Sequence, residues 1–174
     1  MAPELQKKLS DPEFFVEIFV QPGEYYFGDS DTRIRTILGS CIAICLWHPK
    51  RQIGGMCHYM LSGWANDQPF SGNPTPAKYA EDSMQLFLRD IKKNQTRPEE
   101  YQAKIFGGGY MMSGTAEKES GVGAKNITAA HKILKENGIK IVGENTGENV
   151  HRKIFFDIWN GEVWMKKTPY NKEI

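Results

Sequence analysis

Several features that would place a chain in a specialised class are absent from this sequence. The first 13 residues are polar and charged, so they lack the apolar core of a secretory signal, and no apolar run approaches the roughly 20 residues of a membrane span. Lysine plus arginine (22) nearly balances aspartate plus glutamate (21), which leaves no strong basic field to attract nucleic acid. We therefore expect a cytoplasmic protein with no nucleic-acid partner and no membrane insertion.

Cysteine is also scarce, with three residues in a chain of 174. Three cysteines cannot all pair, and a reducing compartment would keep them as thiols. A chain of this length can bury roughly 70% of its unfolded surface in one core, so it needs no disulfide or metal for stability. We expect a single domain over residues 1–174, in which residues 1–13 form a loose N-terminal tail.

The residues that could carry out chemistry are concentrated between positions 36 and 58. Cys41 follows a tight Gly39-Ser40 corner, and an apolar run, a polar turn at His48-Pro49-Lys50-Arg51 and a second short run lead to His58. This composition predicts a β-hairpin. A hairpin symmetric about Pro49-Lys50 would place Cys41 directly opposite His58, with Cβ atoms roughly 4.5–5.5 Å apart. The alternative is that Cys41 is a small buried hydrophobe and His58 ends a strand by chance.

The motif L-G-S-C-I-A-I-C-L at 38–46, with His58 following 17 residues after Cys41, resembles the chemoreceptor glutamine deamidase family, CheD. The similarity covers residues 24–167 in the family's order. It includes K-Y-A-E-D-S-M at 78–84, K-I-F-G-G at 104–108, G-A-K-N at 123–126 and R-K-I-F-F-D at 152–157. The resemblance implies a layered α/β sandwich like the catalytic domain of cytotoxic necrotizing factor toxins.

The same resemblance implies a protein-glutamine glutaminase, which is an amidohydrolase acting on linear amides. Its substrates would be glutamine side chains of methyl-accepting chemoreceptors, converted to glutamate with release of ammonia during chemotaxis adaptation. It also implies a CheC-type phosphatase as a regulatory partner, and we expect some action on glutamyl methyl esters and no cofactor or metal. Two alternatives stay open: a largely non-catalytic regulator of that phosphatase, and a thiol hydrolase of small amides.

Amide hydrolysis by a thiol assigns roles to particular residues. Cys41 would be the nucleophile, and His58 would act first as base and then as acid, with an adjacent imidazolium lowering the thiol pKa. The backbone N–H groups around Gly39, Ser40 and Cys41 are the nearest donors for the oxyanion. The family resemblance adds Thr36 as the residue that orients the imidazole, and a threonine chosen for strand propensity is the alternative.

Metal binding is the main chemical rival, because cysteine and histidine are dense between positions 41 and 58. Along a strand, however, Cys41 and Cys45 would lie about 13 Å apart, too far to share zinc. Zinc stays an alternative only if the segment is helical, because residues i and i+4 of a helix could converge on one ion. Cys45 and Cys57 are expected to be packed in the core. The loop at 62–76, with Trp64 and Phe70, is either anchored to the body or a rim that contacts substrate.

The remaining pattern predicts an α/β layered sandwich with a mixed, largely antiparallel sheet. The glycines at 107–109 lack a nucleotide-binding motif and instead predict close backbone approach near the site. His131 is expected to be solvated, and His151 has no visible partner. Besides the hairpin, the expected strands cover residues 14–20, 24–27, 101–106, 139–142, 152–158 and 162–166, and residues 33–38 lead into the cysteine corner. The expected helices begin at Thr75-Pro76 and at Gly123.

Overall fold

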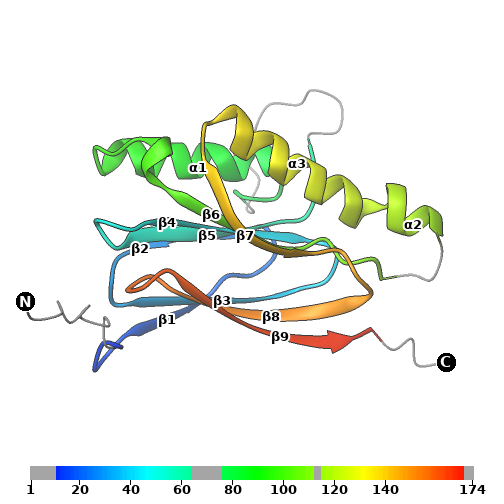
Figure 1. The fold of residues 1–174 in the computed structure, drawn as a ribbon, viewed down its shortest axis with the longest axis horizontal. Coiled ribbons are helices and arrows are strands. Elements are labelled where there is room, and N and C mark those ends of the chain that lie inside the picture. Colours follow the sequence, from blue (N-terminus) through cyan, green and yellow to red (C-terminus); the bar gives the residue numbers. More distant parts are fainter. Residues whose placement is uncertain (1–10, 64–75, 112–114, 171–174) are drawn as a thin grey trace, which may run out of the picture.

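The computed structural model describes residues 11–63, 76–111 and 115–170. Within these residues two β-sheets are stacked, and the helices cover one side of the stack (Figure 1). The inner sheet has the strand order β2-β5-β4-β6-β7 and lies between the helices and the outer sheet, which has the order β1-β3-β8-β9. The predicted mixed α/β class is confirmed, with two sheets in place of one. The likeness to cytotoxic necrotizing factor toxins stays a prediction.

The elements follow one another with short connections. The strands are β1 (Val16–Phe19), β2 (Tyr25–Gly28), β3 (Thr32–Leu38), β4 (Ile42–His48), β5 (Ile53–Tyr59), β6 (Gln102–Gly107), β7 (Lys140–Thr146), β8 (Val150–Asp157) and β9 (Glu162–Pro169). The helices are α1 (Ala80–Lys93), a short 3-10 helix (Pro98–Glu100), α2 (Thr115–Ser120) and α3 (Val122–Glu136). No helix in the described ranges is both long and apolar enough to cross a membrane.

Most neighbouring strands run antiparallel, as predicted. The parallel pairs are β1 with β3 and β6 with β7, whereas the other adjacent strands of both sheets are antiparallel. The β8–β9 hairpin turns at Asn160-Gly161, where Gly161 has φ +74°. This positive φ explains the glycine at that turn, because residues with a Cβ rarely adopt it.

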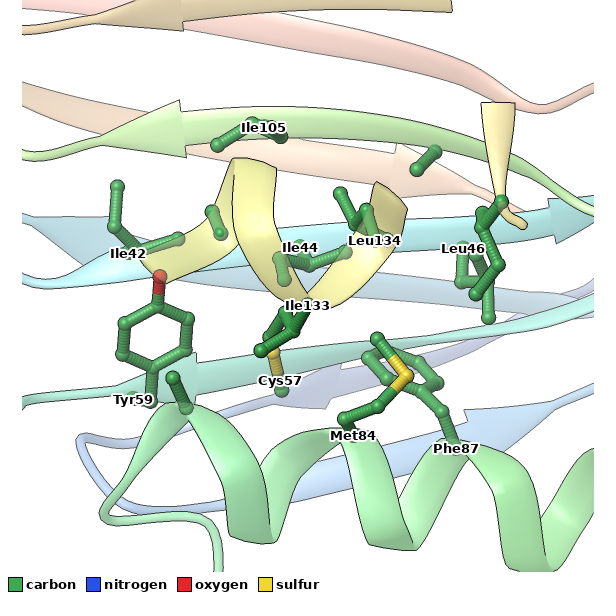
Figure 2. Packing of buried hydrophobic residues seen from close by; sticks show 14 of the residues in the cluster. Ile42, Ile44, Leu46, Cys57, Tyr59, Met84, Phe87, Ile105, Ile133 and Leu134 are labelled. Atoms are coloured by element: carbon green, nitrogen blue, oxygen red, sulfur yellow. The ribbon is translucent and has the colours of Figure 1, made fainter. Parts of the chain in front are cut away.

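Two apolar clusters hold the layers together. The first lies between the inner sheet and helices α1 and α3, and Figure 2 shows its central side chains, with Met84 and Phe87 of α1 close to strand residues. The second lies between the two sheets. Strand β4 contributes to both, since Ile42 and Ile44 face the helices while Ala43 faces the outer sheet. A strand buried on both faces reads as a continuous apolar run, which is what the sequence has there.

Helix α1 begins later than predicted. Its first residue is Ala80, and the extended backbone before it pairs with the chain that leaves β5. The N–H groups of Met60 and Leu61 donate to the carbonyl of Lys78 (2.9 and 3.2 Å). This pairing keeps residues 78–79 out of the helix, so the predicted start at Thr75-Pro76 is wrong. Trp64, Phe70 and most of the predicted N-terminal tail lie outside the described residues.

Candidate active site

The hairpin that carries the predicted pair has a different register from the prediction. Ala43, and not Cys41, lies opposite His58 across β4 and β5. The predicted turn, centred on the Pro49-Lys50 bond, is replaced by a loop of residues 49–52, which is centred one residue later. Two-residue hairpin turns need a positive φ at their first central position, and the ring of Pro49 fixes φ near −65°. The direct opposition of Cys41 and His58 is therefore wrong, and the proline is the physical reason.

The error amounts to two positions, so Cys41 and His58 still share one face of the sheet. That face points toward the outer sheet, where Cys41 packs against the inter-sheet cluster. Cys41 directly precedes β4, and extending the register by one position makes it a diagonal neighbour of His58. In that relation α-carbons lie roughly 7–8 Å apart and long side chains can still meet. No hydrogen bond joins them within the described part of the chain. Their catalytic pairing stays a prediction that this placement supports.

A buried hydrogen-bond chain orients the imidazole of His58. The Thr36 hydroxyl donates to the carbonyl of Val20 (2.6 Å) and lies 2.8 Å from Nδ1 of His58. A hydroxyl has one proton to donate, so with that proton on the Val20 carbonyl it can only accept from Nδ1. His58 then carries its proton on Nδ1, which leaves the Nε2 lone pair free to accept a proton. Thr36 and His58 are both about 1% exposed, so the chain is shielded from water.

Burial keeps both His58 and Cys41 uncharged near neutral pH. Burial lowers the pKa of His58 to about 4, although the nearby Val20 carbonyl and Glu24 oppose the shift. Burial also raises the pKa of the Cys41 thiol, and its own backbone N–H offsets part of this. Near neutral pH the imidazole is therefore uncharged, so the expected imidazolium that lowers the thiol pKa is not found. A neutral imidazole can instead take the thiol proton as the attack occurs.

Three consecutive carbonyl groups fix the backbone around Cys41. The carbonyls of Gly39 and Cys41 accept hydrogen bonds from the N–H groups of Gly109 (2.9 Å) and Gly108 (2.8 Å). The Ser40 carbonyl accepts from a side chain of α3. Within the described residues the N–H groups of Ser40 and Cys41 donate to no backbone carbonyl. These two N–H groups can therefore donate hydrogen bonds to a developing oxyanion without breaking a backbone hydrogen bond.

The glycines at 107–109 approach the corner as closely as predicted. Gly107 has φ +110°, and a Cβ at this position would overlap the Cys41 carbonyl oxygen. A Cβ on Gly108 would meet the side chain of Ile127. The absence of side chains thus lets β6 and α3 press against the backbone that carries Cys41.

The chain was compared with known proteins and protein families. The family model described as CheD chemotactic sensory transduction matches residues 60–167. A Dechloromonas aromatica protein named "Probable chemoreceptor glutamine deamidase CheD 3" is 42% identical over 154 residues, which cover 88% of this chain and 89% of that protein. The chain belongs to the CheD family.

Further CheD proteins are similar over most of their length. One from Pseudomonas savastanoi is 41% identical over 92% of this chain and 90% of its own length. One from Leptospira interrogans is 39% identical over 92% of this chain and 98% of its own length. Among solved structures, a Neisseria meningitidis protein of the DUF152 family matches with TM-score 0.49 and 12% identity, over 76% of this chain and 64% of its own. The CheD family model begins after His58, so the roles of Thr36, Cys41 and His58 depend on geometry and on the resemblance of their motif.

Two residues at the site of this CheD protein were missed by sequence reasoning. Asn126 bonds to the corner from α3, and the imidazole of His151 lies beside Gly39, with its ring 5.2 Å from that of Tyr170. Asn126 stands in the quoted motif G-A-K-N, but nothing in its spacing indicates a contact with Ser40. His151 is outside any motif pattern, and only the pairing of β8 with β3 brings it near.

The other candidate residues lie away from the site. Cys45 and Cys57 are fully buried on opposite faces of the inner sheet, as predicted for core residues. Burial raises the pKa of Cys45 strongly and that of Cys57 to about 11. His131 is 45% exposed and forms an ion-pair contact with Glu144 (2.8 Å), in line with the prediction of a solvated histidine.

Proposed function

We propose that this CheD protein deamidates glutamine side chains of chemoreceptors, with Cys41 as nucleophile and His58 as base and then acid. Thr36 holds the imidazole, and the N–H groups at the Gly39-Ser40 corner, including that of Cys41, bind the oxyanion. The single observation that carries this proposal is the Val20–Thr36–His58 chain, which leaves Nε2 free on the face shared with Cys41. The names of the CheD relatives support the substrate class.

The reaction needs only this chain and water. The thiol sulfur of Cys41 bonds to the carboxamide carbon while its proton passes to Nε2 of His58. The tetrahedral intermediate collapses, the carbon–nitrogen bond breaks, and ammonia leaves with the proton from His58. Water, deprotonated by His58, then attacks the thioester carbon, the carbon–sulfur bond breaks, and the proton on His58 passes to the sulfur. The products are the side-chain carboxyl group, which ionises to glutamate, and the free thiol. No cofactor, oxidant or reductant enters this balance.

A purified cytoplasmic fragment of a chemoreceptor tests the proposal. Incubation with the protein should add about 1 Da to peptides that contain modified glutamines, with one ammonia released per site. Free glutamine and a short glutamine peptide should be turned over far more slowly. Faster turnover of free glutamine would support a hydrolase of small amides instead, and no mass change in any substrate would support a non-catalytic regulator.

We also propose a cytoplasmic location and a CheC-type phosphatase as partner, both from the family resemblance. A purified phosphatase of that class should compete with the receptor fragment and slow its deamidation. Deamidation rates that do not change at saturating phosphatase would contradict the partnership without affecting the enzymatic proposal.

A further inference from the structure

The buried side chain of Asn126 joins the two segments that carry the proposed catalytic pair. Asn126 lies near the start of α3 and is 0% exposed. Its Nδ2 atom donates to the carbonyls of Ser40 (3.1 Å) and Met60 (3.0 Å). Ser40 directly precedes Cys41, and Met60 follows His58 by two positions. One amide therefore connects the corner before β4 to the end of β5.

The contacts determine which way the Asn126 amide faces. Both neighbours are carbonyl oxygens, which accept hydrogen bonds only, and Nδ2 has two protons to give. The Oδ1 atom is buried and has no hydrogen-bond partner in the described part of the protein. A reversed amide would aim Oδ1 at both carbonyls and leave them unpaired. Asn126 thus serves this corner as a double donor, at the cost of an unpaired acceptor.

A bond to the Ser40 carbonyl also fixes the N–H of Cys41. The peptide unit is planar and trans, so its C=O and N–H point in opposite directions. With the carbonyl held toward α3, the Cys41 N–H is turned away from α3. Burial is the larger influence on the Cys41 pKa and raises it, whereas the residue's own N–H lowers it, which indicates that this N–H lies near Sγ.

We propose that Asn126 is a positioning residue that holds the Ser40–Cys41 peptide so that the Cys41 N–H donates to the oxyanion formed during attack. The inference rests on the proposed function and deepens it. An oxyanion is stabilised only by donors that are already aimed at it, because reorienting a peptide during the reaction would cost part of the gain. Asn126 acts through this peptide and touches neither the thiol nor the substrate.

The variant Asn126→Ala removes both donors, and Tyr59→Phe provides a matched control. The Tyr59 hydroxyl donates to the backbone carbonyl of Asn126 (2.5 Å), so its loss loosens the same turn of α3 without touching the corner. We expect kcat for receptor deamidation to fall about 100-fold in Asn126→Ala with KM within about three-fold, and kcat of Tyr59→Phe to stay within about three-fold. Equal kcat losses in both variants would show that Asn126 only anchors the helix.

Alkylation separates positioning of the oxyanion donor from damage to the thiol. Iodoacetamide reacts with Cys41 without forming an oxyanion on a carbonyl carbon, so its rate in Asn126→Ala should fall far less than kcat for deamidation. The alkylation midpoint should rise only slightly, because burial and not the Cys41 N–H is the larger influence on the thiol pKa. A parallel loss of alkylation and deamidation would overturn the proposal, because the defect would then lie in the thiol itself.

A measurement on the wild-type protein decides the matter even if Asn126→Ala does not fold. A peptide whose glutamine carboxamide is replaced by an aldehyde adds to a thiol: sulfur bonds to the carbonyl carbon and the thiol proton moves to its oxygen. We expect the Cys41 amide proton to shift downfield in a nitrogen–proton NMR spectrum and to exchange more slowly with water. An unchanged Cys41 amide would overturn the proposal. This test needs no receptor, so failure to deamidate receptors would refute the proposed function separately.

Discussion

Lowering the pH should destabilise this protein through His58. Its pKa falls from an ordinary 6.5 to about 4 in the folded state because the ring is buried beside Thr36. Between about pH 6.5 and about pH 4 the His58 ring is therefore protonated in the unfolded chain but neutral in the folded chain. The free energy of unfolding thus falls as the pH drops through this range. At about pH 4.5 the two pKa values give a loss of about 2.5 kcal/mol, and the full shift corresponds to about 3.4 kcal/mol.

Urea unfolding monitored by tryptophan fluorescence measures this effect against two variants. His58→Gln lacks the titrating ring, whereas His131→Gln removes a histidine that is 45% exposed. Between about pH 7 and about pH 4.5 the wild-type protein and His131→Gln should lose about 2.5 kcal/mol more than His58→Gln, because carboxylate effects are common to all three. An equal loss of unfolding free energy in all three proteins would show that His58 is not held neutral by burial. It would then contradict the assignment of His58 as the base that takes the Cys41 proton.

Three further changes test other parts of the account. Thr36→Val should lower kcat/KM for deamidation at least about ten-fold and the free energy of unfolding in urea by about 1–3 kcal/mol, because it leaves the Val20 carbonyl and Nδ1 of His58 unpaired. Thr36→Ser keeps the hydroxyl and should retain most of the activity and stability in the same assays. Gly107→Ala should lower Tm by far more than Gly147→Ala, because both glycines have a positive φ but only a Cβ at position 107 would overlap another backbone atom. Similar Tm values for the two variants would contradict the close approach of Gly107 to the Cys41 corner. Limiting iodoacetamide should label Cys41 first by peptide mapping, because the other two cysteines are fully buried; equal labelling would count against its exposure.

The sequence predicted those features that depend on local pattern. The continuous apolar run of β4 and the Asn160-Gly161 turn follow from residue type at short range, and both were found. The glycines at 107–109 were also interpreted correctly, because their lack of a nucleotide-binding motif left close packing as their use.

The features that sequence reasoning missed depend on tertiary contacts or on detailed turn chemistry. The hairpin register was wrong because the turn was centred on the Pro49-Lys50 bond, and a two-residue turn at that bond would need a positive φ that Pro49 cannot adopt. The predicted start of α1 was wrong because the chain that leaves β5 forms hydrogen bonds with the Lys78 carbonyl. Helix-start signals in the sequence carry no information about this long-range pairing. Asn126 reaches Ser40 across 86 positions of sequence, and burial, not residue type, makes His58 neutral.

The most direct test of the central claim is the deamidation of a receptor cytoplasmic fragment by Cys41→Ala beside Cys45→Ala. Alanine at position 41 cannot attack a carbonyl, whereas alanine at position 45 removes only a buried core thiol. Mass spectrometry should show the gain of about 1 Da per site with the wild-type protein and with Cys45→Ala, and none with Cys41→Ala at equal folded concentration. Deamidation by Cys41→Ala within a few-fold of the wild-type rate would contradict the mechanism.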